Sequence, residues 1–139
     1  MAKDDSMGGG KSVLLVEDEA NIREAMAFLL GREGWRVETE ENGAAALGRI
    51  RQLKPDLVVL DYMLPGRNGM EILSDLRADP DFALLPVLML TARGQARDRE
   101  QAERAGVSRF MTKPFSNAEV LTAVRDLVYV AGAAQRASG

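Results

Sequence analysis

Polar side chains able to do chemistry follow directly on the apolar runs of this sequence. They are Glu17, Asp18, Asp61, Thr91 and Lys113. Carboxylates that lie close together repel one another unless a hard cation sits among them, and oxygen ligands with open water positions suit Mg²⁺. The set therefore predicts a divalent-metal site if the fold brings these residues together.

The composition excludes several other chemistries. The 139 residues contain no Cys and no His, which removes disulfides, thiolate or imidazole metal sites and His-based triads. The 18 basic and 21 acidic residues give a net charge of −3, so direct nucleic-acid binding is not expected. No apolar run approaches the roughly 18–20 residues of a membrane-spanning helix. The apolar fraction of 46% is typical of one globular domain.

Short apolar runs alternate with stretches of helical periodicity along the chain. Strands are expected at 12–16, 35–39, 57–60, 87–90 and 108–111. Asn42 can cap the second helix, Gly106 ends the fourth, and the fifth runs from about Asn117 to about Gly132. Strands that alternate with helices form βα units with a parallel sheet. The predicted fold class is α/β, doubly wound, with five strands.

The domain boundaries follow from composition. Residues 1–10 carry charge but no apolar signal-peptide core, and we interpret them as a disordered tail or an expression remnant. Residues 11–132 form the predicted domain. Residues 133–139 are small and polar, and we interpret them as a flexible tail or linker.

The topology predicts that the polar residues meet. Ligands of an open parallel sheet bind outside the carboxyl ends of its strands, and neighbouring strands lie about 4.8 Å apart. Each residue alone has a simpler interpretation: Asp18 as a helix cap, Asp61 as a turn residue, Lys113 as a solvated charge. Polar groups of the needed kinds at four strand ends favour one shared site.

Residues 12–130 resemble a receiver domain of the two-component response regulators. The matching motifs are Val-Leu-Leu-Val-Glu-Asp-Glu at 13–19, Pro-Asp-Leu-Val-Val-Leu-Asp-Tyr-Met-Leu-Pro at 55–65 with Gly69 closing the loop, Leu-Thr-Ala-Arg at 90–93 and Thr-Lys-Pro-Phe at 112–115. The presence of all these motifs in this order is specific for the receiver family. The resemblance implies a CheY-like, flavodoxin-like (βα)5 fold with strand order 2-1-3-4-5.

The resemblance also implies a phosphoacceptor and its metal ligands. Asp61 would accept a phosphoryl group from a histidine kinase or a His phosphotransfer protein. Asp18, Asp61 and the backbone carbonyl of Met63 would bind Mg²⁺ (or Mn²⁺), and Glu17 would act through water. An aspartate is a competent nucleophile for phosphoryl transfer, and cations offset the charge on the transferred group.

Further implied roles concern contact and switching. Thr91 and Lys113 would contact the phosphoryl oxygens, and the Lys113–Pro114 bond is expected to be cis. Thr91 and Phe110 would form the switch that alters the face made by the fourth helix, fifth strand and fifth helix.

Some positions depart from the family pattern, and others are ones that influence the rate of dephosphorylation in the family. Glu17 replaces Asp in the acidic pair and keeps an oxygen ligand. Arg109 stands where one DNA-binding branch uses an acid for dimer salt bridges. Met63 and Arg93 occupy positions that influence loss of the phosphoryl group. An apolar Met63 cannot orient an attacking water, so slow self-dephosphorylation is expected.

The implied role is phosphorelay signal transduction in a bacterial cytoplasm. The chain would catalyse only its own phosphorylation and dephosphorylation, and would control a downstream protein partner or a covalently attached effector. A stand-alone receiver and one cut from a longer regulator both remain open. A monomer or a weak phosphorylation-dependent dimer is expected, without membrane association.

Three alternatives compete with this function. A Mg²⁺-dependent phosphatase with an Asp nucleophile would need a second Asp where Met63 stands. In a flavin-binding electron carrier, Glu17, Asp18 and Glu19 would repel the FMN phosphate. A receiver-like binding module independent of phosphorylation normally lacks one of the key residues, all of which are present.

Overall fold

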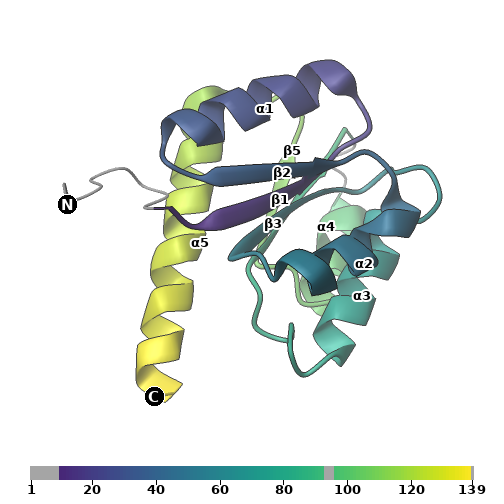
Figure 1. The fold of residues 1–139 in the computed structure, drawn as a ribbon. Helices are drawn as coiled ribbons and strands as arrows, with labels where there is room; N and C mark the ends of the chain where they lie inside the picture. Colours follow the sequence, from purple (N-terminus) through teal and green to yellow (C-terminus); the bar gives the residue numbers. More distant parts are fainter. Residues whose placement is uncertain (1–9, 93–95, 139) are drawn as a thin grey trace.

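A parallel five-stranded sheet forms the centre of the chain in the computed structural model, which describes residues 10–92 and 96–138 (Figure 1). The strands are β1 (Ser12–Val16), β2 (Arg36–Glu40), β3 (Leu57–Asp61), β4 (Val87–Thr91) and β5 (Arg109–Thr112). The helices are α1 (Ala20–Arg32), α2 (Gly43–Leu53), α3 (Gly69–Ala78), α4 (Ala96–Arg104) and α5 (Asn117–Ser138). The strand order is β2-β1-β3-β4-β5, so the predicted class and order are confirmed.

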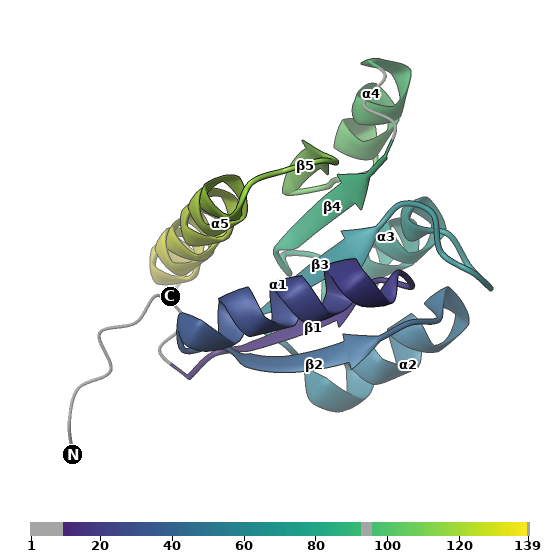
Figure 2. The same ribbon diagram turned by 90° about the horizontal axis from the view of Figure 1, so that it is seen from above.

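Helices cover both faces of the sheet (Figures 1 and 2). On one face, Val13 and Leu15 of β1 share an apolar cluster with α1 and α5. On the other face, Leu14 and Val16 of the same strand pack in a cluster with residues of α2, α3 and α4. Successive side chains of a strand point to opposite faces. Two-sided burial therefore explains why the three inner strands, β1, β3 and β4, are mostly continuous apolar runs.

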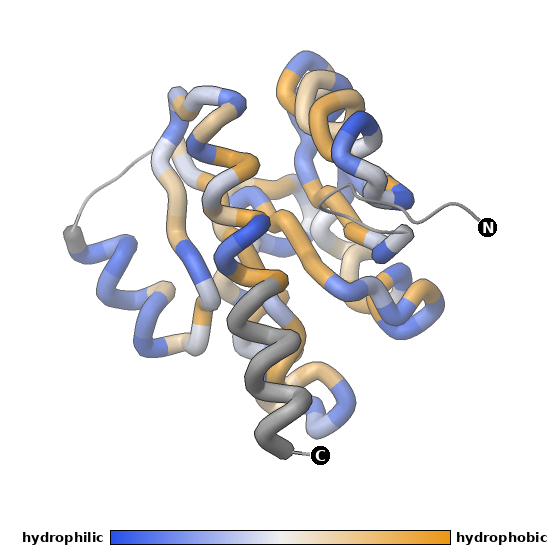
Figure 3. Tube along the Cα trace, turned by 90° about the vertical axis from the view of Figure 1, so that its left-hand side faces the viewer, coloured by the Kyte–Doolittle hydropathy of each residue, from blue (hydrophilic) through white to orange (hydrophobic). Residues whose placement is uncertain are grey.

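Helix α4 is the most hydrophilic of the five helices, and Figure 3 shows it mostly in blue. Six of the nine residues in its sequence, ARDREQAER, are charged. Ala102 is fully buried and belongs to the α2–α3–α4 cluster. The core contact of α4 therefore involves a small side chain rather than a large one.

Trp35, the single tryptophan, is 4% exposed and lies just before β2. It packs in the cluster that α1 and α5 cover. The strand arrows all run toward the same edge of the sheet (Figure 2), so Trp35 lies at the opposite, amino-terminal edge. Its indole nitrogen is buried without a hydrogen-bond partner.

Most predicted helix ends agree with the structure. Asn42 caps α2 by accepting a hydrogen bond from the Ala44 amide, and α5 begins at Asn117. The far end of α5 differs, because the helix continues past Gly132 to Ser138. Alanine is the strongest helix former, and the alanines after Gly132 offset the roughly 1 kcal/mol that a helical glycine costs. The proposed division between domain and tail at residue 133 thus coincides with no break in the helix.

Residues 1–9 of the predicted N-terminal tail lie outside the described ranges. Within those ranges, no helix combines the length and the apolar character needed to cross a membrane.

Candidate functional site

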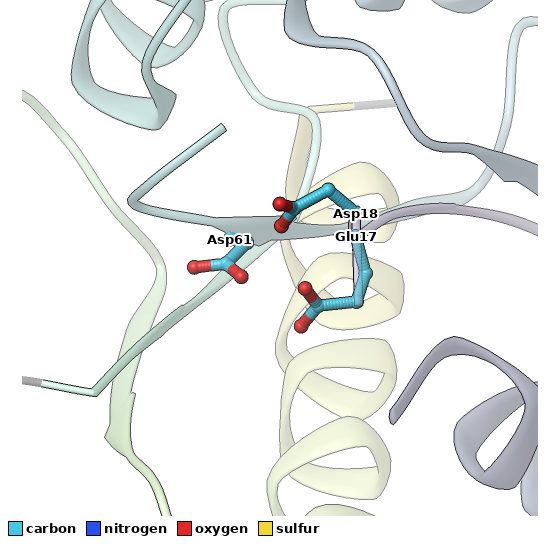
Figure 4. Close-up of side chains that lie close together, drawn as sticks. All are labelled: Glu17, Asp18 and Asp61. Carbon is cyan, nitrogen blue, oxygen red and sulfur yellow. The ribbon is translucent and has the colours of Figure 1, made fainter. Parts of the chain in front are cut away.

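Three carboxylates meet at the carboxyl ends of β1 and β3. Glu17 and Asp18 follow β1, and Asp61 is the last residue of β3. The two strands are neighbours with Val16 opposite Leu60, so the residues that follow them lie side by side. Each carboxylate places an oxygen within 4.8 Å of the others, and Figure 4 shows them directed toward a common space. The predicted convergence of these three residues is confirmed.

Lys113 contacts this cluster from the end of β5, which is separated from β3 by β4. Its Nζ atom donates to Asp61 Oδ2 at 2.8 Å and to Glu17 Oε1 at 3.0 Å. The residue follows β5, and its backbone amide donates to the Thr91 carbonyl at 2.7 Å. The Lys113–Pro114 bond is cis, as expected. The structure therefore does not support reading Lys113 as an ordinary solvated charge.

Burial sets the electrostatics of the cluster. Glu17 is fully buried. Its pKa rises to about 7, because burial and the hydrogen bond with Asp61 outweigh the opposing effects of Lys113 and of the Glu19 amide. Burial alone would lower the pKa of Lys113, but its bonds to Asp61 and Glu17 raise it. The lysine is thus held as a cation between two buried acids.

Asp61 is held at the mouth of the loop that follows β3. It is 4% exposed, and its Oδ1 accepts a hydrogen bond from the Met63 amide at 3.2 Å. Met63 itself is 58% exposed. The backbone of Gly69 lies so close that an added Cβ would be 2.5 Å from the Asp61 carbonyl oxygen. A glycine at this position therefore allows the loop to close over the end of β3.

The segment that carries Glu17 and Asp18 is fixed by its backbone. The Glu17 amide donates to the Glu40 carbonyl at 3.0 Å, and the Glu19 amide donates to Glu17 Oε2 at 3.1 Å. Arg23 Nη1 donates to the carbonyls of Glu17 and Asp18 at 2.9 and 3.3 Å. The N-cap of α1 is Glu19, which makes no side-chain cap bond. Asp18, which is exposed, is therefore not the cap residue of this helix.

Sequence reasoning missed Arg23. In the sequence it is one of several charges in a helical stretch, and no motif quoted above includes it. Its position one helical turn after Glu19 is the one signal that could have suggested contact with the acidic segment.

The two expected switch residues lie on β4 and β5. Thr91 is 1% exposed and ends β4, opposite Thr112 in register. Phe110 is half-buried against the α2–α3–α4 cluster, and the Arg99 guanidinium lies 5.6 Å from its ring centroid. Arg93 lies outside the described residues.

Arg109 forms an ion pair within its own chain. Its Nη1 lies 3.3 Å from Asp126 Oδ2 on α5. Both side chains are about half exposed, so the pair adds little stability. The charge that departs from the family pattern thus has a partner on the adjacent helix.

The acidic cluster fits a hard divalent cation. Its donors are carboxylate oxygens from three residues, the ligand type that Mg²⁺ prefers. Asp18 is exposed, which leaves the site open to water. Mg²⁺ commonly keeps several water ligands, so an open acidic site suits it better than a closed cage.

A doubly wound 2-1-3-4-5 sheet, with acids after β1 and at the end of β3 and a lysine after β5, defines a class of α/β signalling modules. The model of the response regulator receiver domain family matches residues 13–125, and the chain belongs to this family. It is therefore a receiver domain of the two-component type, a signalling module rather than a classical enzyme.

Curated relatives include whole transcriptional regulators. The chain is 36% identical over 115 residues to the phosphate regulon transcriptional regulatory protein PhoB of Escherichia coli, covering 83% of this chain and 50% of PhoB. It is 39% identical over 128 residues to the probable transcriptional regulatory protein TcrX of Mycobacterium tuberculosis, covering 92% and 54%. The chain thus spans about half the length of these relatives.

A similar solved structure has its metal in place. It is the receiver domain of a sensor histidine kinase from Pseudomonas aeruginosa, with a magnesium ion coordinated in its active-site cleft. The two structures superpose with a TM-score of 0.79 at 28% identity, covering 86% of this chain and 98% of the other.

Proposed function

We propose that this receiver accepts a phosphoryl group on Asp61 from a phosphohistidine of a histidine kinase or a His phosphotransfer protein, in a Mg²⁺-dependent reaction. One observation carries the proposal: Glu17, Asp18 and Asp61 converge at one edge of the sheet, with the Lys113 ammonium bonded to two of them. Asp61 and Glu17 each accept hydrogen bonds from Lys113 and from a backbone amide, but Glu17 is fully buried whereas Asp61 is 4% exposed at the end of β3.

The reaction needs a nucleophile and compensation of charge. A carboxylate oxygen of Asp61 attacks phosphorus, the bond from phosphorus to the donor nitrogen breaks, and an acyl phosphate forms. Lys113 already lies 2.8 Å from Asp61 and supplies positive charge for the phosphoryl oxygens. Thr91 ends the neighbouring strand and supplies a hydroxyl for the same group.

Asp18, Asp61 and the backbone carbonyl of Met63 would hold Mg²⁺ (or Mn²⁺), with Glu17 acting through water. A bound divalent cation offsets the negative charge that gathers on the transferred group. The magnesium ion in the related Pseudomonas aeruginosa receiver supports this assignment.

The α4–β5–α5 face would be the surface that changes on phosphorylation and contacts the next component. Phe110 is half-buried, and α4 packs against the core through the small residue Ala102. Movement of Thr91 toward the phosphoryl group would open space behind it, into which Phe110 rotates. The altered face would then control a downstream protein or an attached effector. Because PhoB and TcrX are transcriptional regulatory proteins, an attached DNA-binding effector is one form that this output would take.

Intact-mass spectrometry after incubation with acetyl phosphate and Mg²⁺ tests the proposal. We expect one phosphoryl adduct on the parent chain, and none without Mg²⁺ or in Asp61→Asn. Asp56→Asn is the matched control, because Asp56 lies at the opposite end of β3 and accepts a hydrogen bond from the Ser12 amide. An adduct that persists in Asp61→Asn would overturn the assignment. No adduct on a folded, Mg²⁺-binding parent would favour either strict specificity for a protein donor or a binding module independent of phosphorylation, and phosphorylated donor protein would separate these two.

A further inference from the structure

We propose that Arg23 of α1 is a positioning residue, which holds the backbone of Glu17 and Asp18 in the conformation that binds a divalent cation. The inference rests on the proposed function, because it concerns the same metal site. Arg23 is not one of the proposed ligands, and it acts through the segment that carries them.

The contacts of Arg23 are with backbone rather than with the carboxylates. Its Nη1 atom donates to two consecutive carbonyls, those of Glu17 at 2.9 Å and Asp18 at 3.3 Å. The carboxylates of the same two residues are directed toward Asp61 (Figure 4). One guanidinium nitrogen thus fixes two adjacent peptide groups, and the direction of both side chains depends on those peptides.

Arg23 also connects this segment to the end of β2. Its Nη2 atom lies 3.7 Å from Glu41 Oε2. The Arg23 side chain is 19% exposed, whereas that of Glu41 is 71% exposed. A planar guanidinium in a largely buried position loses little further freedom when it forms several hydrogen bonds. The bonds to carbonyls, rather than the exposed ion pair, therefore provide most of its hold on the segment.

Charge alone would give Arg23 the opposite effect. A positive group close to the acidic cluster repels a divalent cation, so its removal would strengthen Mg²⁺ binding. If Arg23 positions the ligands, its removal weakens Mg²⁺ binding in spite of that repulsion. The two roles therefore predict opposite changes in the same quantity.

Isothermal titration of Mg²⁺ into the full chain at pH 8 measures that quantity. We expect Arg23→Met and Arg23→Lys each to raise the Kd for Mg²⁺ by about tenfold, the usual scale for groups that orient metal ligands. Lysine keeps the charge but not the planar fork. Arg36→Met is the matched control, because Arg36 Nε donates to the Gly10 carbonyl at 2.9 Å beside the amino-terminal start of β2. Its Kd for Mg²⁺ should equal that of the parent.

Unfolding in EDTA separates positioning from general support of the fold. A purely structural role would lower the midpoint of thermal unfolding and leave the Kd unchanged at temperatures where the variants are folded, and that result would overturn the inference. Unchanged or tighter Mg²⁺ binding in folded Arg23→Met, or parental binding in Arg23→Lys, would also overturn it. Should Arg23→Met fail to fold, Arg23→Lys decides.

A parent chain that binds no Mg²⁺ would overturn both the metal site and the role of Arg23. A parent whose Mg²⁺ binding is lost in Asp61→Asn but kept in the folded Arg23 variants would overturn only the role of Arg23.

Discussion

Lys113 and Asp61 are joined by a hydrogen bond of 2.8 Å although they lie 52 positions apart in the sequence. They belong to the ends of β5 and β3, and β4 lies between these two strands in the sheet. The ammonium group therefore reaches across one strand to contact the carboxylate. This ammonium group is paired with Asp61 and with Glu17, so it places a positive charge within the acidic cluster.

Removal of Lys113 should separate metal binding from phosphorylation. In Lys113→Met we expect Mg²⁺ to bind at least about tenfold more tightly, because a competing cation is gone. Labelling by acetyl phosphate should slow by about a hundredfold, because the transferred group loses a charged donor. Titration calorimetry and timed mass spectrometry measure the two effects. Lys11→Met, an exposed lysine just before β1, should change neither. Weaker Mg²⁺ binding in Lys113→Met would contradict this prediction.

Glu17 should make the metal-free domain less stable as the pH rises. Its native pKa of about 7 exceeds the ordinary value of 4.5, so the native state binds the proton more tightly than the unfolded state. The free energy of unfolding therefore falls between pH 4.5 and 7. The difference in free energy of unfolding between Glu17→Gln and the parent should therefore shift in favour of the variant by on the order of 2 kcal/mol from pH 5 to pH 7.5.

Urea unfolding in EDTA at a series of pH values tests this gain. Glu24→Gln removes an exposed acid of α1 and serves as the control. Parallel pH curves for the parent and Glu17→Gln would show that burial does not perturb this carboxyl group.

Met63 is predicted to slow the loss of the phosphoryl group. The residue is 58% exposed two positions after Asp61, and its thioether cannot orient an attacking water. Met63→Asn adds an amide that can do so. One new hydrogen bond in the transition state corresponds to a rate increase of about tenfold. The decay of the mass adduct over time measures the rate, with Met63→Leu as the control. Equal decay in Met63→Asn and the parent would refute the explanation.

Two glycines of α2 should respond in opposite ways to alanine. A Cβ at Gly43 would overlap the Arg67 carbonyl oxygen in the loop after β3, whereas a Cβ at Gly48 would meet nothing within 4 Å. Gly43→Ala should lower the free energy of unfolding by about 1–3 kcal/mol through overpacking. Gly48→Ala should raise it by about 0.5–1 kcal/mol through helix propensity. Urea unfolding measures both, and a stabilised Gly43→Ala would contradict the close packing of this loop.

The sequence was sufficient to predict the sheet and the meeting of the acids. The run that ends at Asp61 is buried on both faces, and such runs show their structure through composition alone. Parallel topology then requires that the residues after β1 and β3 lie at one edge. These conclusions depend on the hydrophobic periodicity and on the order of the elements along the chain, and both can be read from a single sequence.

Some side-chain contacts could not be predicted from the sequence. Arg23 contacts carbonyls, which every residue has, so no pairing of residue types reveals the contact. The ion pair of Arg109 with Asp126 depends on how α5 lies beside β5. Residues after Gly132 resemble a linker in composition, but their alanine content favours helix, and α5 continues through them to Ser138.

The position of Trp35 determines what fluorescence can report. The indole lies at the amino-terminal start of β2, and the acids lie beyond the carboxyl ends of the strands, about 17 Å away along a five-residue strand. Its emission should change when the core opens and stay constant when a cation or a phosphoryl group enters the site. Stability and occupancy can therefore be followed independently in one sample, with tryptophan emission for the first and mass or heat for the second.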